Sequence, residues 1–190
     1  IMPSLVGSEM CIRDSSITAT GTLQYGDVIH YQAIVRLADG KQPTAAKSIL
    51  QKSRAYRSAA SVSSTTAKLS SNGHQISDVN LFAPTSGKQL EPYVSLRSTS
   101  TNQALTLPST GIIITSKPAK ALKLSTGDRL KVMTTAGQAH RFTVKGIAKN
   151  YVGHFGYLSA TAYQQLVGKQ SAPNSLLVRC LLYTSPSPRD

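Results

Sequence analysis

The 190-residue chain is poor in cysteine and acidic residues and contains no tryptophan. Its two cysteines, Cys11 and Cys180, lie near the two ends of the sequence. The long stretch between them therefore offers no disulfide framework, no CxxC metal clip and no cysteine nucleophile. A cysteine-free domain of this kind is compatible with an exposed bacterial surface.

Catalytic motifs are also missing. With eight acidic residues in the whole chain, paired carboxylates for general acid–base catalysis are not expected. No GxSxG elbow or SxxK pair occurs, although the sequence alone does not exclude a Ser-His-Asp arrangement. Ser86–Gly87–Lys88 lacks the upstream glycine of a phosphate loop, and Gln89 replaces its hydroxyl residue. We therefore predict that this chain is not an enzyme and binds no cofactor.

Long apolar runs and metal-ligand clusters are absent from the sequence as well. The apolar runs extend over only a few residues, whereas a bilayer-spanning helix needs roughly 20. The four histidines, His30, His74, His140 and His154, are widely spaced and have no i, i+4 partner. This spacing predicts no metal site.

Positive charge is abundant, with 21 lysines and arginines and a net charge of +13. Such a balance favours anionic partners, namely nucleic acid, anionic lipid headgroups or anionic wall polymers. The basic residues are spread along the sequence without a long run, and aromatic residues do not interleave with them. We therefore expect no nucleic-acid partner and interpret the charge mainly as a solvated surface in an anionic environment.

The two ends differ from the rest of the chain. Ile1–Ser15 (IMPSLVGSEMCIRDS) and Cys180–Asp190 (CLLYTSPSPRD) carry no sustained helical or strand period, and the first is not a signal peptide. Both resemble translated sequencing-adapter read-through; the alternative is two genuine disordered tails. We expect residues 16–179 to form the domain, with one or two lobes.

The stretch from Thr110 to Leu158 organises the domain. Its pattern predicts, in order, a short buried strand, a short helix, a hairpin and a bulge or bend. The positions that define these elements are Ile112–Ile114 (strand), Ser116 (helix cap, with Pro118 in the first turn), Arg129–Thr134 and Arg141–Lys145 (hairpin strands around Ala136–Gly137) and Gly146 (bulge). Leu130, Val132, Phe142 and Val144 are expected on the inner face. Gly111, the last residue of an LPSTG sequence, is expected to allow close packing rather than to mark a sortase site.

Shorter patterns predict the remaining elements. They are Asp27–Leu37 (a strand entering the core at Ala33–Val35), Asp39–Gly40 (a turn), a helix from Pro43 with Ala46, Ile49, Leu50 and Ser53 on one face, Ser58–Lys68 (a long edge strand or a flexible connection), Asn72–Gly73 (a type I′ hairpin turn), Tyr93–Leu96 (a strand), a helix capped by Ser159 or Thr161 and ended by Gly168, and Asn174–Arg179 (a strand). In Gln75–Phe82, Ile76 and Val79 have opposite parity, so only the end of that strand is convincing. These elements together predict an α+β domain with mixed or antiparallel sheets and a few short helices.

Two segments carry a family resemblance. The first starts at Gly111 and reads GIIITSKPAKALKLSTGDRLKV; the second starts at Phe142 and reads FTVKGIAKNYVGHFGYLSATAYQQL. Both resemble the extracytoplasmic domain of FtsX-like ABC transporter permeases, the group that includes MacB-type proteins. The large permeases of Gram-positive bacteria in particular place a GIIIT-type segment before a strand pair and an NYVGH-type segment after it. The resemblance covers about a quarter to a third of the chain well.

The resemblance implies a MacB-like periplasmic core fold and a mechanical, recognitional function at the cell membrane, on its extracytoplasmic side. The domain would couple ATP-driven movement of membrane helices to substrate export or to regulation of a wall or envelope partner. ATP hydrolysis would belong to a separate ABC ATPase subunit, and the permease would be a homo- or heterodimer. The alternative from another class is a secreted basic module that binds anionic cell-wall polymer; anionic lipid is a further partner that the charge allows.

The most distinctive segment runs from Asn150 to Tyr157. In one interpretation its aromatic residues cover a sheet edge and its glycines permit tight turns. In the other, an aromatic cluster with a histidine forms a contact surface for a substrate, a partner protein or another lobe. The candidate contact residues are Asn150, Tyr151, Gly153, His154, Phe155 and Tyr157.

Overall fold

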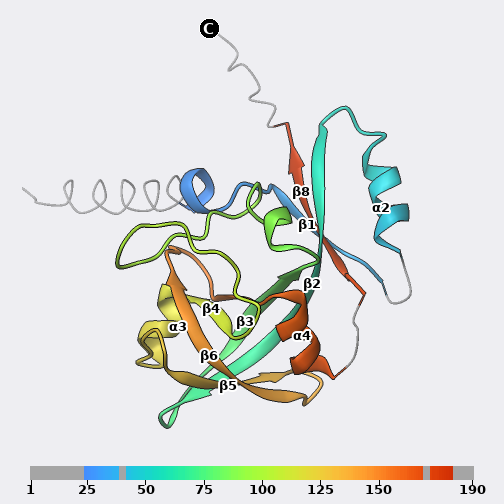
Figure 1. Ribbon diagram of the computed structural model, residues 1–190. Coiled ribbons are helices and arrows are strands. Elements are labelled where there is room, and N and C mark those ends of the chain that lie inside the picture. Colours follow the sequence, from blue (N-terminus) through green and yellow to red (C-terminus); the bar gives the residue numbers. More distant parts are fainter. Residues whose placement is uncertain (1–23, 39–41, 169–171, 182–190) are drawn as a thin grey trace, which may run out of the picture.

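The computed structural model describes residues 24–38, 42–168 and 172–181 (Figure 1). The strands are β1 (Ala33–Arg36), β2 (Tyr56–Ser71), β3 (His74–Pro84), β4 (Ile112–Thr115), β5 (Arg129–Thr134), β6 (Ala139–Ala148), β7 (Phe155–Tyr157) and β8 (Ser175–Cys180). The helices are η1 (Gln24–Val28), α2 (Pro43–Leu50), η2 (Gly87–Gln89), α3 (Ser116–Ala121) and α4 (Ala160–Val167). Among these helices, none has the length and apolar character needed to cross a bilayer.

Within the described residues, the strands form one eight-stranded sheet in the order β1-β8-β2-β3-β7-β4-β6-β5. An additional antiparallel pairing between β2 and β5 closes part of this sheet on itself. Six strands, β2, β3, β7, β4, β6 and β5, thus form a ring, which we call the six-strand ring, and β8 and β1 extend from β2 outside it. The β3–β7 and β4–β6 pairs are parallel and the others antiparallel, so the predicted α+β class with mixed pairing is confirmed.

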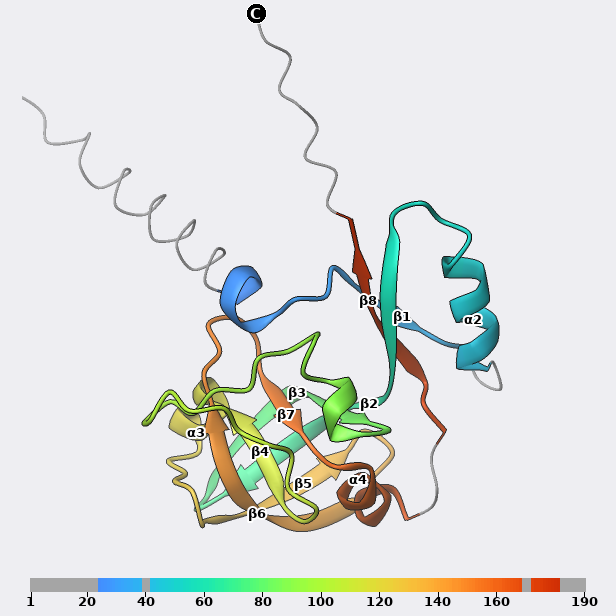
Figure 2. The ribbon, with the colours of Figure 1, turned by 45° about the horizontal axis from the view of Figure 1, so that its top comes forward.

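The interior of the six-strand ring holds the larger apolar core. Leu69, Leu81, Ile112 and Val132 are fully buried there, and buried residues of α3 and α4 pack against the same cluster. The two helices lie on different sides of the ring (Figures 1 and 2). The predicted inward faces of the β5–β6 hairpin, with Leu130, Val132, Phe142 and Val144, are confirmed.

A second apolar cluster lies on the other face of β2, β3, β4 and β8. It includes Val62, Phe82, Ile113, Tyr157 and Leu177, and the irregular segment 90–107 covers it. Strands β2, β3, β4 and β6 each contribute residues to both clusters, so the two cores share one continuous sheet.

β2 is longer than the predicted stretch, and it is not an edge strand. The stretch Ser58–Lys68, which the sequence left open between an edge strand and a flexible connection, lies inside a 16-residue strand paired on both sides. Its serines, threonines and alanines are all buried or half-buried, since small side chains fit where sheet faces on both sides are covered. Periodicity failed there because neither face is strongly polar.

A bulge in β3 resolves the conflicting parity of the second hairpin strand. Between the pairs Ala67↔Val79 and Leu69↔Ile76, β3 has one more residue than β2, and Asp78 adopts a positive φ of 58°. The extra residue turns Ile76 to the same side as Val79, and both contact the ring interior. The predicted turn at Asn72–Gly73 is confirmed, with φ values of 50° and 76°.

The bulge predicted near Gly146 is confirmed in β6. The register shifts between Ile112↔Val144 and Ile113↔Gly146, which leaves Lys145 without a Cα partner on β4. Beyond this point Ile147 packs against the ring interior, whereas Ala148 belongs to the second cluster. One strand thereby serves both cores.

The N-terminal prediction was wrong in two respects. Asp27–Leu37 is not one strand, because residues 24–28 form the π-helical turn η1 and only Ala33–Arg36 form a strand, β1. Ala33 and Ile34 are exposed instead of entering the core, since β1 is the edge strand beside β8. The predicted helix from Pro43 is present as α2, but none of its residues is buried. The turn predicted at Asp39–Gly40 and the residues 1–23 and 182–190 lie outside the described part.

Smaller differences concern caps and short strands. Ser116 is the first residue of α3 and not its cap; its hydroxyl donates to the carbonyl oxygen of Asn150 at 3.0 Å. Tyr93–Leu96 is irregular, with a single bridge from Val94 to Ile29. Ser159 caps α4 and Gly168 ends it, as predicted. Strand β8 continues through Cys180, and the Leu181 N–H donates to the Ala55 carbonyl at 2.7 Å.

Candidate functional site

The candidate contact segment 150–157 connects the end of β6 to β7. β7 lies between β3 and β4, so the second half of this segment is a strand of the six-strand ring. The side chains named from the sequence therefore divide between the sheet and a preceding loop.

Asn150 organises the loop and is itself buried, with 6% of its surface exposed. Its Nδ2 donates to the carbonyl oxygens of Val152 at 2.6 Å and Gly153 at 3.2 Å. Its Oδ1 accepts a hydrogen bond from Nε2 of Gln24 at 2.8 Å. These bonds hold the loop in shape, which is a structural use of this side chain.

Gln24 is the partner that the sequence did not reveal. This side chain is fully buried, and its Oε1 accepts from the backbone N–H groups of Tyr151 at 2.8 Å and Val152 at 3.0 Å. The Gln24–Asn150 clamp therefore ties the first described turn of the chain to a loop 126 residues away. No local pattern around a single glutamine signals such a role.

Two aromatic residues of the segment, Phe155 and Tyr157, pack in the second cluster. Phe155 stacks on Phe82 with ring centroids 6.0 Å apart, and Tyr157 lies 6.3 Å from the same ring at a tilt of 31°. Burial, with a smaller contribution from Tyr31, raises the pKa of Tyr157 far above its ordinary value. The buried hydroxyl thus stays neutral at any physiological pH.

Gly153 and His154 complete the turn into β7. Gly153 has a φ of +80°, and a Cβ at this position would lie 2.9 Å from the Phe155 ring. The His154 carbonyl accepts from the Asn80 N–H at 2.9 Å. The side chains of Tyr151 and His154 are half-buried, and Val152, with 45% of its surface exposed, is the most accessible residue of the loop. The six candidates thus do not form one exposed aromatic surface, and their role in binding stays a prediction.

The segment between β3 and β4 encloses an apolar hollow of about 540 Å³. Leucine and valine side chains from residues 90–107 line it, with Lys88, Glu91 and Arg97 among the polar lining residues. The leucine and valine residues of the lining continue into the second cluster; they are Leu90, Val94, Leu96, Leu105 and Leu107. No sustained helical or strand period marks Leu105 and Leu107 in the sequence, because the segment that carries them is irregular.

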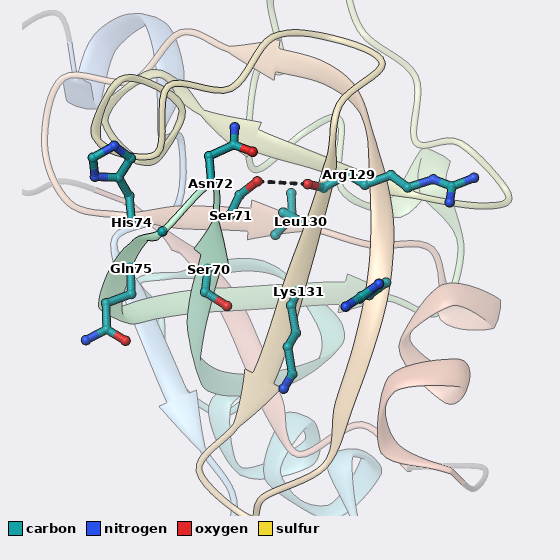
Figure 3. A pocket seen from close by; sticks show the side chains of 10 residues that line it. Ser70, Ser71, Asn72, His74, Gln75, Arg129, Leu130 and Lys131 are labelled. Atoms are coloured by element: carbon teal, nitrogen blue, oxygen red, sulfur yellow. Dashed lines mark hydrogen bonds between the residues drawn. The ribbon is translucent and has the colours of Figure 1, made fainter.

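A second hollow, of about 490 Å³, lies beside the turn of the β2–β3 hairpin (Figure 3). Its wall is formed by the hairpin residues 70–75, by Arg129–Lys131 and by Arg141. The Ser71 hydroxyl donates to the Arg129 carbonyl at 3.0 Å, which fastens the hairpin turn to the start of β5. The lining includes three cationic side chains and no carboxylate.

The four histidines stay apart. In the part of the chain that the structure describes, no group of three histidine, cysteine, aspartate or glutamate side chains could hold a metal ion. His30 bonds the Ser95 hydroxyl at 2.8 Å, and His140 lies against Phe142 with ring centroids 4.6 Å apart.

The close packing predicted at Gly111 is present. Its φ is +90°, and a Cβ there would lie 2.6 Å from the backbone oxygen of Thr143. The residues that spell LPSTG therefore lead directly into β4, and the Ser109 carbonyl accepts from the Ser159 hydroxyl at 2.9 Å.

No protein-family model and no curated protein matches the chain. Among solved structures, the chain is similar to the periplasmic region of MacB from Actinobacillus actinomycetemcomitans, with a TM-score of 0.49 and 13% identity over 80% of this chain and 75% of that one. It is also similar to the extracellular domain of the noncanonical ABC-type transporter YknZ from Gram-positive bacteria, with a TM-score of 0.49 and 14% identity over 79% of this chain and 83% of that one.

Proposed function

We propose that residues 16–179 are the extracytoplasmic domain of an FtsX-like ABC transporter permease and that this domain moves as a rigid body between two membrane segments. The observation that carries the proposal is the antiparallel pairing of the first and last strands. Ala33 of β1 lies opposite Val178 of β8, and the Cys180 N–H donates to Oε1 of Gln32 at 2.8 Å. The start of the first strand therefore lies beside the end of the last strand, an arrangement that suits a domain inserted between two neighbouring spans.

The residues that resemble the permease family support the same proposal. They form β4, α3, β5, β6, β7 and α4, which supply most of the six-strand ring and the helices packed against it. The two resembling segments are thus parts of one structural unit. The resemblance is the argument for the family; the pairing of β1 with β8 is the argument for insertion.

β2 provides a path for mechanical coupling. Residues 56–62 of this strand pair with β8, the last strand of the chain, whereas residues 62–71 pair with β3 and, in part, β5 in the ring. At about 3.3 Å per residue, sixteen residues extend over at most about 50 Å. Displacement of the chain ends would therefore be transmitted along one continuous strand to the far end of the domain.

In this proposal ATP is hydrolysed by a separate ABC subunit, and the domain itself performs no catalysis. Movement driven by that subunit would export a substrate or regulate a wall or envelope partner, within a homo- or heterodimeric permease at the cell membrane. The apolar hollow beside residues 90–107 is the surface best suited to a partner or substrate contact, because it combines an apolar wall with charged rim residues.

The decisive experiment is recovery of the intact gene from its source. We expect a membrane-spanning segment before residue 16, another after residue 179 and an ATPase gene beside them. Complete flanks with a cleavable signal peptide and a stop codon shortly after Arg179 would instead support the secreted binder of wall polymer, the candidate that the +13 charge favours. Unaided turnover of a substrate by the purified chain would contradict both candidates.

The rigid-body part of the proposal can be tested separately by hydrogen exchange. Amides in both halves of β2, Ala59–Val62 and Thr65–Leu69, are expected to exchange together, at rates near that of global unfolding. If the amides of Ala59–Val62, in the half paired with β8, exchange orders of magnitude faster than those of Thr65–Leu69, then β2 does not couple β8 to the six-strand ring.

A further inference from the structure

Four cationic side chains gather on the outer face of the six-strand ring. They are Lys68 of β2, Arg129 and Lys131 of β5, and Arg141 of β6, and together we call them the basic face. Their neighbours in sequence, Leu69, Leu130, Val132 and Phe142, point into the ring. Because side chains alternate along a strand, the four cations share the opposite, outer side.

The strand register brings like charges together within this face. Lys131 lies directly opposite Arg141 in the β5–β6 pair, and on its other side it lies opposite Ser70 of β2. Neighbouring strands are about 4.8 Å apart, and like charges directly opposite each other destabilise an antiparallel pair. The hairpin therefore places two cationic residues directly opposite each other, an arrangement that lowers the stability of the pair.

No acid within the described residues forms an ion pair with these cations. Asp128, the acid next to β5 in sequence, accepts the Ser125 N–H at 2.7 Å in the preceding turn. Asp78 lies in the β3 bulge opposite Lys68, and its side chain has no bond to it. The repulsion between Lys131 and Arg141 is thus left for a ligand to relieve.

The hollow beside the hairpin turn is built from hydrogen-bond donors. Figure 3 shows His74 and Gln75 on the hairpin side of it and Lys131 on β5. Hydroxyl groups of Ser70 and Ser71 and the Asn72 amide complete the polar lining. Leu130 is its single aliphatic residue, and no phenylalanine, tyrosine or tryptophan lines it. Such a lining suits oxygen-rich anions, because its cations and hydrogen-bond donors can all bind anionic oxygen atoms.

This hollow lies far from the place where the chain enters and leaves. Tyr56, at the start of β2, is paired with Cys180, whereas Ser71, at the other end of β2, adjoins the hollow. In Figure 1 the hairpin turn accordingly lies at the opposite end of the molecule from the end of β8. A domain anchored through its chain ends would direct this face away from the bilayer, which disfavours lipid headgroups as the ligand.

We propose that the basic face and the adjoining hollow bind the phosphate groups of an extended phosphodiester polymer. Strand geometry places the Cα atoms of Arg129 and Lys131 about 6.6 Å apart along β5. It places the Cα atoms of Lys131 and Arg141 about 4.8 Å apart across the two strands. Cations in such a row neutralise successive backbone phosphates, and arginine adds bidentate contacts. That the polymer lies outside the cell rests on the function proposed above; the binding itself does not.

Binding is tested with fluorescently labelled, unlipidated poly(glycerol phosphate) and the full 190-residue chain, by anisotropy over a series of salt concentrations. The test variant is Lys131→Gln with Arg141→Gln. The matched control, Lys52→Gln with Arg54→Gln, removes the same charge from exposed positions after α2. We expect the test variant to bind at least tenfold more weakly, with the slope of log K against log salt reduced by about 1.4–1.8, because each phosphate contact contributes about 0.7–0.9. The control is expected to bind within twofold of the unaltered chain.

Several results would overturn the proposal. Equal weakening of the test and control variants would show attraction by net charge alone. Polyglutamate of equal charge serves as a competitor without phosphate. If it displaces the labelled polymer as strongly as unlabelled poly(glycerol phosphate) does, phosphate is not the recognised group. Tighter binding to anionic vesicles would identify a lipid headgroup, and tighter binding to single-stranded DNA would identify nucleic acid.

Folding of the variants is checked by circular dichroism. Since the substitutions remove a repulsion, we expect the test variant to melt at or above the temperature of the unaltered chain. If the double variant does not fold, Lys131→Gln alone is expected to weaken binding three- to fivefold, and an unchanged affinity would overturn the proposal. A gene without membrane spans would end the permease proposal and leave this measurement unaffected.

Discussion

Helices α2 and α4 have the same length and both carry an amphipathic pattern, yet only one of them belongs to a core. α4 buries Ala162, Tyr163 and Leu166 against the six-strand ring. α2 buries no residue, and 69% of the surface of Ile49 is exposed. The pattern of a helix shows that it has an apolar face; it does not show that the fold supplies a surface for that face.

The helix ends differ in the same direction. In α4 the Ser159 hydroxyl accepts from the Ala162 N–H at 3.1 Å, and Gly168 ends the helix with a φ of 74°. In α2 the N-cap is Gln42, which makes no side-chain capping bond, and the C-cap Gln51 stays in the right-handed region. Packing and capping thus support α4 together, whereas α2 contacts β2 without burying any of its residues.

The largest expected effect is a loss of core packing in α4. Leu166→Ala should lower the free energy of unfolding by about 2–5 kcal/mol, because it removes buried methyl groups and leaves a cavity. Ile49→Ala in α2 should change it by less than about 0.5 kcal/mol. Urea denaturation followed by circular dichroism measures both values, and equal losses would show that α2 also packs against a core.

The next effect tests the cap of α4. Ser159→Ala should cost about 1 kcal/mol, since it leaves the Ala162 N–H without its acceptor. Thr161→Ala, within the same helix but at no cap position, is the matched control and should be nearly neutral. A larger loss from the control than from Ser159→Ala would place the helix start elsewhere.

A new cap on α2 should reduce the difference between the helices. Gln42 has the extended backbone of an N-cap, with φ −83° and ψ 135°, and Pro43 already occupies the first helical position. Gln42→Asp should therefore stabilise the protein by about 0.5–1 kcal/mol at neutral pH, measured as an increase in the urea midpoint. An unchanged urea midpoint would show that the missing cap of α2 does not lower the stability of the protein.

The smallest effect comes from alkaline pH. Burial, with a further contribution from Tyr25, raises the pKa of Tyr31 to about 12 from its ordinary value of 10. The folded state therefore keeps a proton on Tyr31 that the unfolded state releases. The contribution of Tyr31 to the free energy of unfolding is constant below about pH 9 and falls as the pH rises through 10 towards 12. At pH 10 this amounts to only about 0.4 kcal/mol for Tyr31.

Tyr31→Phe separates this contribution from the other buried tyrosines. Urea midpoints at pH 8 and pH 10 should fall less with pH in the variant than in the unaltered chain. Burial also raises the pKa of Tyr163 in α4, whereas α2 has no tyrosine, so substitutions in α2 should not alter the pH dependence. If Gln42→Asp changes how the urea midpoint varies between pH 8 and pH 10, the pH dependence does not come from the buried tyrosines alone.

Local patterns were sufficient for much of the ring. The β5–β6 hairpin, the turn at Asn72–Gly73 and the caps of α4 follow from alternation, turn residues and a serine before an apolar period. Gly111 could be assigned to a close approach because a glycine precedes a fully apolar strand. These features depend on residues that lie near one another in the chain.

The candidate site was less accessible to such reasoning. Asn150 is a loop clamp because Gln24, far away in sequence, approaches it, and Tyr157 is buried because β7 inserts between β3 and β4. The pairing of Lys131 with Arg141 depends on the register of the hairpin, which spacing alone suggests but does not prove. Contacts of this kind form only when distant segments meet.

The sequence by itself determined that the chain has an α+β domain with a basic surface, because period, turn chemistry and composition act locally. The tertiary structure alone decided that β2 is central, that β2 and β5 close a ring and that α2 has no core, because pairing and burial are properties of segments brought together from across the chain. Strands and helices were therefore largely predictable, whereas their partners were not.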